Sequence, residues 1–109
     1  MKKFLVLYLS TASYAEQMKN ASPEQAKAGM DMWMSWAKKN EGAIVDFGVP
    51  LGNARSIRSA SAGKNDIVGF SILQGESIEA ISKILQDHPH FHAPGAGIEV
   101  FEFLPPPGM

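Results

Sequence analysis

The sequence predicts an α+β fold in which both helices cover one face of an antiparallel sheet. Three observations support this prediction: the order of the strand-forming and helix-forming segments, the helical spacing of apolar residues in two of them, and the continuous apolar character of two strands. The order is strand, helix, two or three strands, helix and strand, which is typical of a split βαβ arrangement. With 109 residues, the whole chain, 1–109, is expected to form a single domain.

The first predicted strand covers residues 3–10, which are rich in strand-forming side chains and show no polar alternation. Residues 11–21 are polar, and we expect them to form a connection. A helix is predicted from Ser22 to near Gly42. Ser22 can cap the amide of Gln25, and the Gln25 side chain can reach back to Ser22. The helix is amphipathic, and its predicted core face holds Ala26, Gly29, Met30, Trp33 and Ala37, with Trp36 on the flank.

The second half of the chain supplies the remaining strands. Residues 43–49 are predicted to form a strand that ends in a glycine and proline turn. Residues 54–60 are either a third strand or a bent continuation of the second, and residues 61–66 form a polar loop. Strands are also predicted at 67–73, where Gly69 and Ser71 thin one face, and at 97–104.

A second helix is predicted to begin after Ser77, which can cap it, and to stop at Pro89. One face of this helix holds Ile78, Ile81, Ile84, Leu85 and His88.

The two helices leave the second face of the sheet without cover. A sheet open to water on that face should alternate apolar and polar residues, but residues 4–9 and 67–73 do not. No other segment of the chain is left to cover it. We therefore expect a homodimer in which two sheets pack face to face, with a ligand-sized pocket beside the helices.

Composition excludes several classes of function. Ten basic and eleven acidic residues give a formal charge of -1, so neither nucleic acid nor a membrane is an expected partner. The absence of cysteine excludes disulfides and thiolate chemistry. The start of the chain imitates a secretory signal, but its apolar run, 4–9, is shorter than such signals require. We therefore expect a cytoplasmic protein.

The three histidines, His88, His90 and His92, alternate in the segment between the last helix and the last strand. In an extended chain they would share one side and could bind a divalent metal. Pro89 and the preceding helix end break that shared side, so neither a metal nor another cofactor is predicted. His88 is expected to end the helix beside the ligand, covering Leu85. His90 is the expected general acid or base, because histidine titrates near neutral pH.

Four more residues are candidates for the site. Asp46 interrupts an apolar strand, where burial would make it a usable base, although an edge position or a pairing with an arginine is the simpler interpretation. Trp36 is a candidate wall for a flat ligand, against a role in the core. Tyr8 and Ser10 offer hydroxyl groups near the end of the first strand, where a buried tyrosine bonded within the protein is the alternative.

Parts of the sequence resemble the YCII-related family of the dimeric α+β barrel superfamily. The resemblance runs over almost the full length and includes Tyr8 in the first strand, the turn segment 41–52 and the segment 69–80. Its strongest part is His88-Pro89 followed by residues 95–100, which looks like the family's glycine-rich loop and last strand. The resemblance implies a ferredoxin-like fold and a dimer.

The resemblance also implies acid–base chemistry on small, often cyclic molecules. A His-Asp pair has been proposed as the active dyad of some members, with the histidine early in the first helix, but residues 22–40 contain no histidine. We therefore expect a small-molecule-binding protein, in its catalytic form a cofactor-free lyase or isomerase using His90 and Asp46. The alternative is a non-catalytic dimeric module that senses a ligand or binds a partner.

Overall fold

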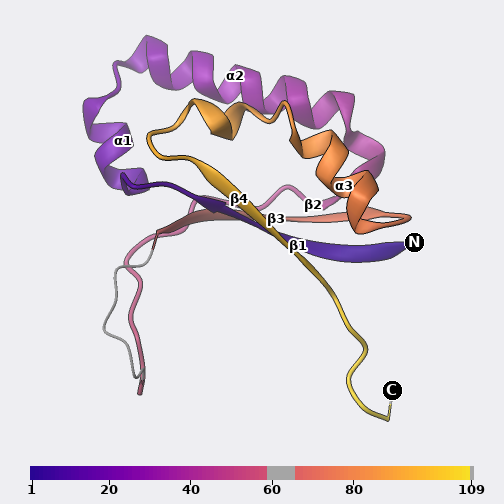
Figure 1. Cartoon of the computed structure of the whole chain (residues 1–109). Helices are drawn as coiled ribbons and strands as arrows, with labels where there is room; N and C mark the ends of the chain where they lie inside the picture. The colour runs from indigo at the N-terminus through magenta and orange to yellow at the C-terminus, as the bar shows by residue number, and fades with distance from the viewer. Residues whose placement is uncertain (59–65, 109) are drawn as a thin grey trace.

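The computed structural model describes residues 1–58 and 66–108, and it has the predicted α+β architecture (Figure 1). Four antiparallel strands form one sheet in the order β2-β3-β1-β4. In Figure 1, α2 and α3 both lie on the same side of this sheet. The elements are β1 (Lys2–Leu9), α1 (Tyr14–Asn20), α2 (Pro23–Lys39), η1 (Glu41–Ala43), β2 (Ile44–Asp46), β3 (Ile67–Gly75), α3 (Ile78–Leu85), η2 (Pro89–His92) and β4 (Gly97–Glu102).

Local capping explains where the helices begin. The Ser22 hydroxyl accepts a hydrogen bond from the Gln25 amide, and the Gln25 side chain accepts one from the Ser22 amide, as predicted. Ser77 caps α3 through the amide of Ala80.

The region expected to be a connection contains an additional helix, α1. Ser13 and Glu16 form a second capping box at its start. The prediction for residues 11–21 was wrong because α1 buries no residue, and so it carries no apolar stripe that would reveal it.

The region after α2 is less regular than predicted. β2 has three residues, shorter than the strand predicted at 43–49, and its pairing with β3 contains an irregularity. Residues 54–58 form no strand, and the rest of the predicted strand at 54–60 lies outside the described residues. Of the loop predicted at 61–66, only Asp66 is described.

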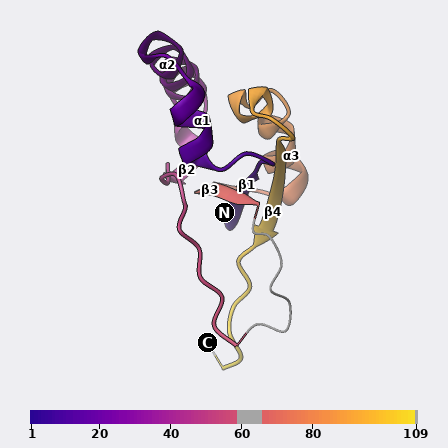
Figure 2. The same ribbon diagram turned by 90° about the vertical axis from the view of Figure 1, so that its left-hand side faces the viewer.

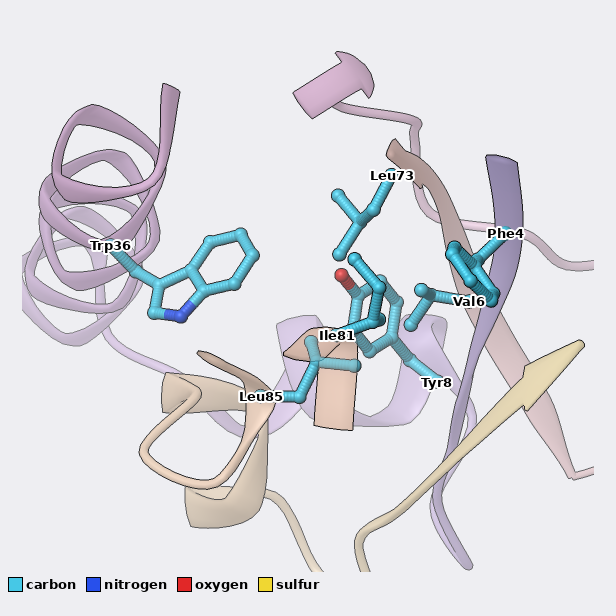
Figure 3. Packing of buried hydrophobic residues seen from close by; sticks show 7 residues of the cluster. All are labelled: Phe4, Val6, Tyr8, Trp36, Leu73, Ile81 and Leu85. Atoms are coloured by element: carbon cyan, nitrogen blue, oxygen red, sulfur yellow. The ribbon is translucent and has the colours of Figure 1, made fainter. Parts of the chain in front are cut away.

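The core lies between the sheet and the helices. Phe4, Val6 and Tyr8 of β1 face the helices and pair with Leu73, Ser71 and Gly69 of β3. Figure 3 shows Trp36 of α2 extending toward Ile81 and Leu85 of α3, opposite the β1 side chains.

None of the described helices lies on the opposite face of the sheet. Its apolar residues alternate with the core residues along the strands, and two segments, 50–58 and 103–108, leave the sheet on this side (Figures 1 and 2). The radius of gyration, 15.2 Å, exceeds the value of roughly 13 Å expected for a compact chain of this length. The uncovered face holds Leu5, Leu7, Leu9, Phe70, Ile72 and Phe101. Within the described residues, no helix has the length and apolar character that crossing a bilayer requires.

Candidate functional site

A group of six rings, Tyr8, Trp33, Trp36, Phe47, His88 and His90, lies between α2 and the sheet. We call it the aromatic–histidine cluster. α2 supplies the two tryptophans and packs against η2, which places the histidines beneath it. β1 supplies Tyr8, and the segment after β2 supplies Phe47. Residues far apart in the sequence therefore meet in one apolar site with several polar atoms.

Tyr8 is fully buried, and a chain of hydrogen bonds holds it in place. Its hydroxyl donates to Ser71 Oγ at 2.8 Å, and the Ser71 hydroxyl donates to the Phe47 carbonyl at 2.6 Å. Burial raises the pKa of Tyr8 to about 12, and the bond to Ser71 opposes this. The Tyr8 ring packs over Gly69, where a Cβ would be in ordinary van der Waals contact with Tyr8 Cδ2 at 3.4 Å. Gly69 and Ser71 are small residues on one face of the predicted strand 67–73, and their small size was the sequence signal for the site.

His90 is buried within η2, whereas the sequence suggested a loop histidine beside a pocket. Its Nε2 lies 2.7 Å from the Leu9 carbonyl. Because a carbonyl oxygen only accepts, Nε2 carries the proton in this bond. Burial lowers the pKa of His90, opposed by backbone groups of Leu9 and Gly97. The Nε2 atom of this expected acid or base is therefore already engaged.

The ring nitrogens of His88 are hydrogen-bonded differently from those of His90. Its Nδ1 accepts a hydrogen bond of 2.9 Å from the His90 amide, so the proton of the neutral ring is on Nε2. Burial lowers the pKa of His88 to about 3, the charge of His90 adds to this, and Asp87 opposes it. The ring is therefore neutral at physiological pH.

The His88 Nε2–H is buried and has no hydrogen-bond partner among residues 1–58 and 66–108. Leaving such a donor unsatisfied costs about 1–3 kcal/mol. Aromatic rings surround it, with the centroids of Trp33 and Trp36 each 4.4 Å from that of His88. Contact with an aromatic face is weaker than a bond to oxygen. The cluster thus retains a fully buried donor that no oxygen of the described residues accepts.

The two tryptophans are buried to different degrees. Trp36 is only 5% exposed, and its Nε1–H donates to the Ile84 carbonyl at 3.1 Å, so it belongs to the core. Trp33, predicted to be core, is half-buried and is in contact with Tyr8, His88 and Phe47. Met30, assigned to the core face, is 54% exposed. The buried side of α2 is thus rotated toward α3.

Asp46 lies at the sheet edge, which was the simpler of the interpretations that the sequence allowed. It is exposed on β2, an edge strand, and its Oδ1 accepts a hydrogen bond of 2.8 Å from the Gly48 amide. Its partner is thus the turn that follows it, and no described hydrogen bond or ion pair joins it to His90. The use of His90 and Asp46 together as proton-transfer groups therefore stays a prediction, without a described contact between the two. His92 is exposed, and no group of three or more acidic or histidine side chains among residues 1–58 and 66–108 could hold a metal.

Ser10 is buried but fully engaged. Its hydroxyl donates to the Pro94 carbonyl at 2.7 Å and accepts from the Ala12 amide and the Gln17 side chain. It therefore anchors the segment before β4 to the end of β1. Ser10 also borders a small pocket of about 130 Å³ near Leu51.

A larger groove of about 390 Å³ runs along the outside of the cluster. It lies between α2 and the segment 87–92, and the Lys39–Asp87 ion pair, 3.3 Å long, joins two of its lining residues. Trp36 lines this groove, and its ring centroid also lies 4.4 Å from that of His88.

The sequence matches no family model and no curated protein. The structure is similar to that of 5-chloro-2-hydroxyhydroquinone dehydrochlorinase from Burkholderia phenoliruptrix AC1100, solved in complex with 2,5-dihydroxybenzoquinone. The TM-score is 0.57 at 16% sequence identity, and the similarity covers 94% of this chain and 93% of that chain. At this identity the similarity establishes the α+β fold alone.

Proposed function

We propose that the protein binds a small organic molecule at the aromatic–histidine cluster. The observation that carries this proposal is the buried His88 Nε2–H, a strong donor held in one tautomer and left without an acceptor. Ligand sites are mostly apolar and contain a few placed polar groups, which is the composition of this cluster. The enzyme of the same fold that binds 2,5-dihydroxybenzoquinone and the resemblance of residues 95–100 to the YCII-related family both support it.

The catalytic form of this proposal is a cofactor-free lyase or isomerase. A neutral histidine donates a hydrogen bond to a carbonyl or oxyanion without becoming a base, and in this way polarises the substrate. His88 would have this role, and His90 would fix its tautomer through the backbone amide. The alternative is a non-catalytic binding module. It is favoured by the exposed position of Asp46 and the engaged Nε2 of His90, which leave the cluster without an evident base.

Replacement of His88 tests the proposed site. We expect wild-type protein to bind 2,5-dihydroxybenzoquinone and His88→Phe to bind it at least about tenfold more weakly, because one hydrogen bond to a charged or carbonyl oxygen is lost. His88→Gln keeps a donor near the Nε2 position and should recover part of the affinity. The measurement is isothermal titration calorimetry, with turnover followed in the absorbance of the quinone.

His92→Phe is the matched control, since His92 is the exposed histidine of the same segment. Equal weakening in His88→Phe and His92→Phe would contradict the site. Binding without turnover in the wild type would favour the non-catalytic module.

We also propose that the protein is a homodimer through the uncovered face of the sheet. Leu5 lies near the centre of that face, where it pairs with Ile72 on one side and Phe101 on the other. Segments 50–58 and 103–108 extend on the same side and expose Leu51, Ile57 and Phe103 (Figure 2). A face of this kind is typical of a surface that another protein covers, and a second copy offers the same face.

A charge at the centre of the uncovered face should dissociate the dimer. Leu5→Asp is expected to give a monomeric mass at micromolar concentration, where the wild type gives twice that mass, because burying an unpaired carboxylate is costly. Sedimentation equilibrium measures both. Met34→Asp, an equivalent change at an exposed apolar residue of α2, should remain dimeric. A monomeric wild type at this concentration would refute the proposal.

A further inference from the structure

The two tryptophans of the cluster are held differently. The Trp36 ring is pinned by its bond to the Ile84 carbonyl. Trp33 is half-buried, and no acceptor among residues 1–58 and 66–108 takes its Nε1–H. Exposed methionines, Met30 and Met34, lie beside it on α2. Among the two tryptophans, the Trp33 side chain is therefore the one that can turn toward solvent without breaking a described hydrogen bond.

The Trp33 indole also lies among four other rings of the cluster. Ring centroids lie 4.4 Å away for His88, 5.0 Å for Tyr8, 6.1 Å for Phe47 and 6.3 Å for His90, all at steep angles to the indole plane. These four rings form the sides of a slot that the flat indole fills. Such a slot accepts a planar ring through edge contacts. The His88 Nε2–H adds the requirement that this ring carry a hydrogen-bond acceptor.

We infer that Trp33 closes the binding site by filling it, and that the natural ligand is a planar ring with a carbonyl or phenolate oxygen, which displaces the indole and accepts the His88 Nε2–H. This inference rests on the proposed function and specifies its ligand class. A neutral hydrogen-bond donor in an apolar slot stabilises an acceptor oxygen of the ligand, and it does not stabilise a cation. Turning the indole outward exposes the donor that the closed protein leaves unsatisfied.

Removal of the Trp33 side chain tests the closed state. We expect Trp33→Ala to bind 4-nitrophenolate at least about tenfold more tightly than wild type, because the cost of populating the open state is removed. 4-Nitrotoluene, a ring of similar size without the phenolate oxygen, should bind Trp33→Ala about tenfold more weakly than 4-nitrophenolate. The double variant Trp33→Ala/His88→Phe should lose that preference. Titrations followed by nuclear magnetic resonance locate both probes through the Tyr8 signals.

A second measurement uses a protein that retains Trp33. The chain has two tryptophans, so the Trp36→Phe variant retains a single indole Nε1–H signal. That signal belongs to Trp33. On addition of 4-nitrophenolate, this signal should move to the position of a solvated indole and exchange rapidly with water. Because Trp33 remains in place here, the result decides the question even if Trp33→Ala does not fold.

The outcomes separate this inference from the proposed function. Binding at Tyr8 and His88 with an unchanged Trp33 signal and no tightening in Trp33→Ala would refute the closing role, while the proposed site would stand. Equal affinity of Trp33→Ala for both probes would refute the ligand class. Failure of 2,5-dihydroxybenzoquinone and both nitro compounds to bind either protein would contradict the proposed site as well.

Discussion

Acidification from pH 7 to pH 4.5 should lower the free energy of unfolding by roughly 3 kcal/mol through His88 alone. In the folded protein, burial lowers the pKa of His88 to about 3, whereas the unfolded chain has the ordinary value of 6.5. Below pH 6.5 the unfolded state therefore binds more protons, and stability falls by about 1.4 kcal/mol per pH unit. The loss continues until pH approaches the folded pKa. His90, whose pKa is also lowered, acts in the same direction.

Urea denaturation at fixed protein concentration measures this loss at each pH. His88→Gln removes the titrating group, so between pH 7 and pH 4.5 it should lose roughly 3 kcal/mol less than wild type. His92→Gln should behave like wild type, because His92 is exposed. An identical acid loss in wild type and His88→Gln would mean that His88 is not held neutral in the folded protein.

Gly48→Ala should lower the free energy of unfolding by more than about 3 kcal/mol, among the larger effects of a single substitution. Gly48 has a φ of +81°, which is unfavourable for alanine. A Cβ there would also lie 1.7 Å from the Phe70 carbonyl oxygen, a backbone atom that cannot turn aside. The displaced turn would carry the Phe47 carbonyl with it and so disturb the Ser71 and Tyr8 bonds.

Gly52→Ala is the matched control, because a Cβ at this nearby glycine would meet nothing within 4 Å. We expect it to change stability by less than about 0.5 kcal/mol. Thermal and urea unfolding of both variants measure the difference. A Gly48→Ala protein as stable as the Gly52→Ala protein would show that the turn adopts another conformation.

Local sequence signals predicted the helix starts. A capping box joins residues three apart, so Ser22 and Gln25 revealed α2 without knowledge of the rest of the fold. The same signal at Ser13 and Glu16 predicts α1, but without an apolar stripe it was read as part of a connection. The uninterrupted apolar character of β1 and β3 likewise revealed that one face of the sheet needs cover.

The candidate site could be predicted only in part. Tyr8, His88 and His90 were identified as candidates and do meet in one cluster, whereas Asp46 is exposed at the end of β2, an edge strand. The sequence pattern identifies a charged residue in an apolar segment. It does not show that the strand formed there is short or that it lies at the edge of the sheet. Trp33 was assigned to the core because a helical wheel gives the apolar face of α2 and not the direction of its neighbours.

The sequence by itself determined the α+β fold, the helix caps and the uncovered sheet face, because these depend on periodicity and on contacts between near neighbours. Only the tertiary structure decided which histidine nitrogen is free. The His90 Nε2 meets the Leu9 carbonyl, 81 residues away in the chain, while the His88 Nε2 meets aromatic rings from α2 and β1. The state of each nitrogen follows from such long-range packing, since burial and hydrogen-bond partners set both the pKa and the tautomer.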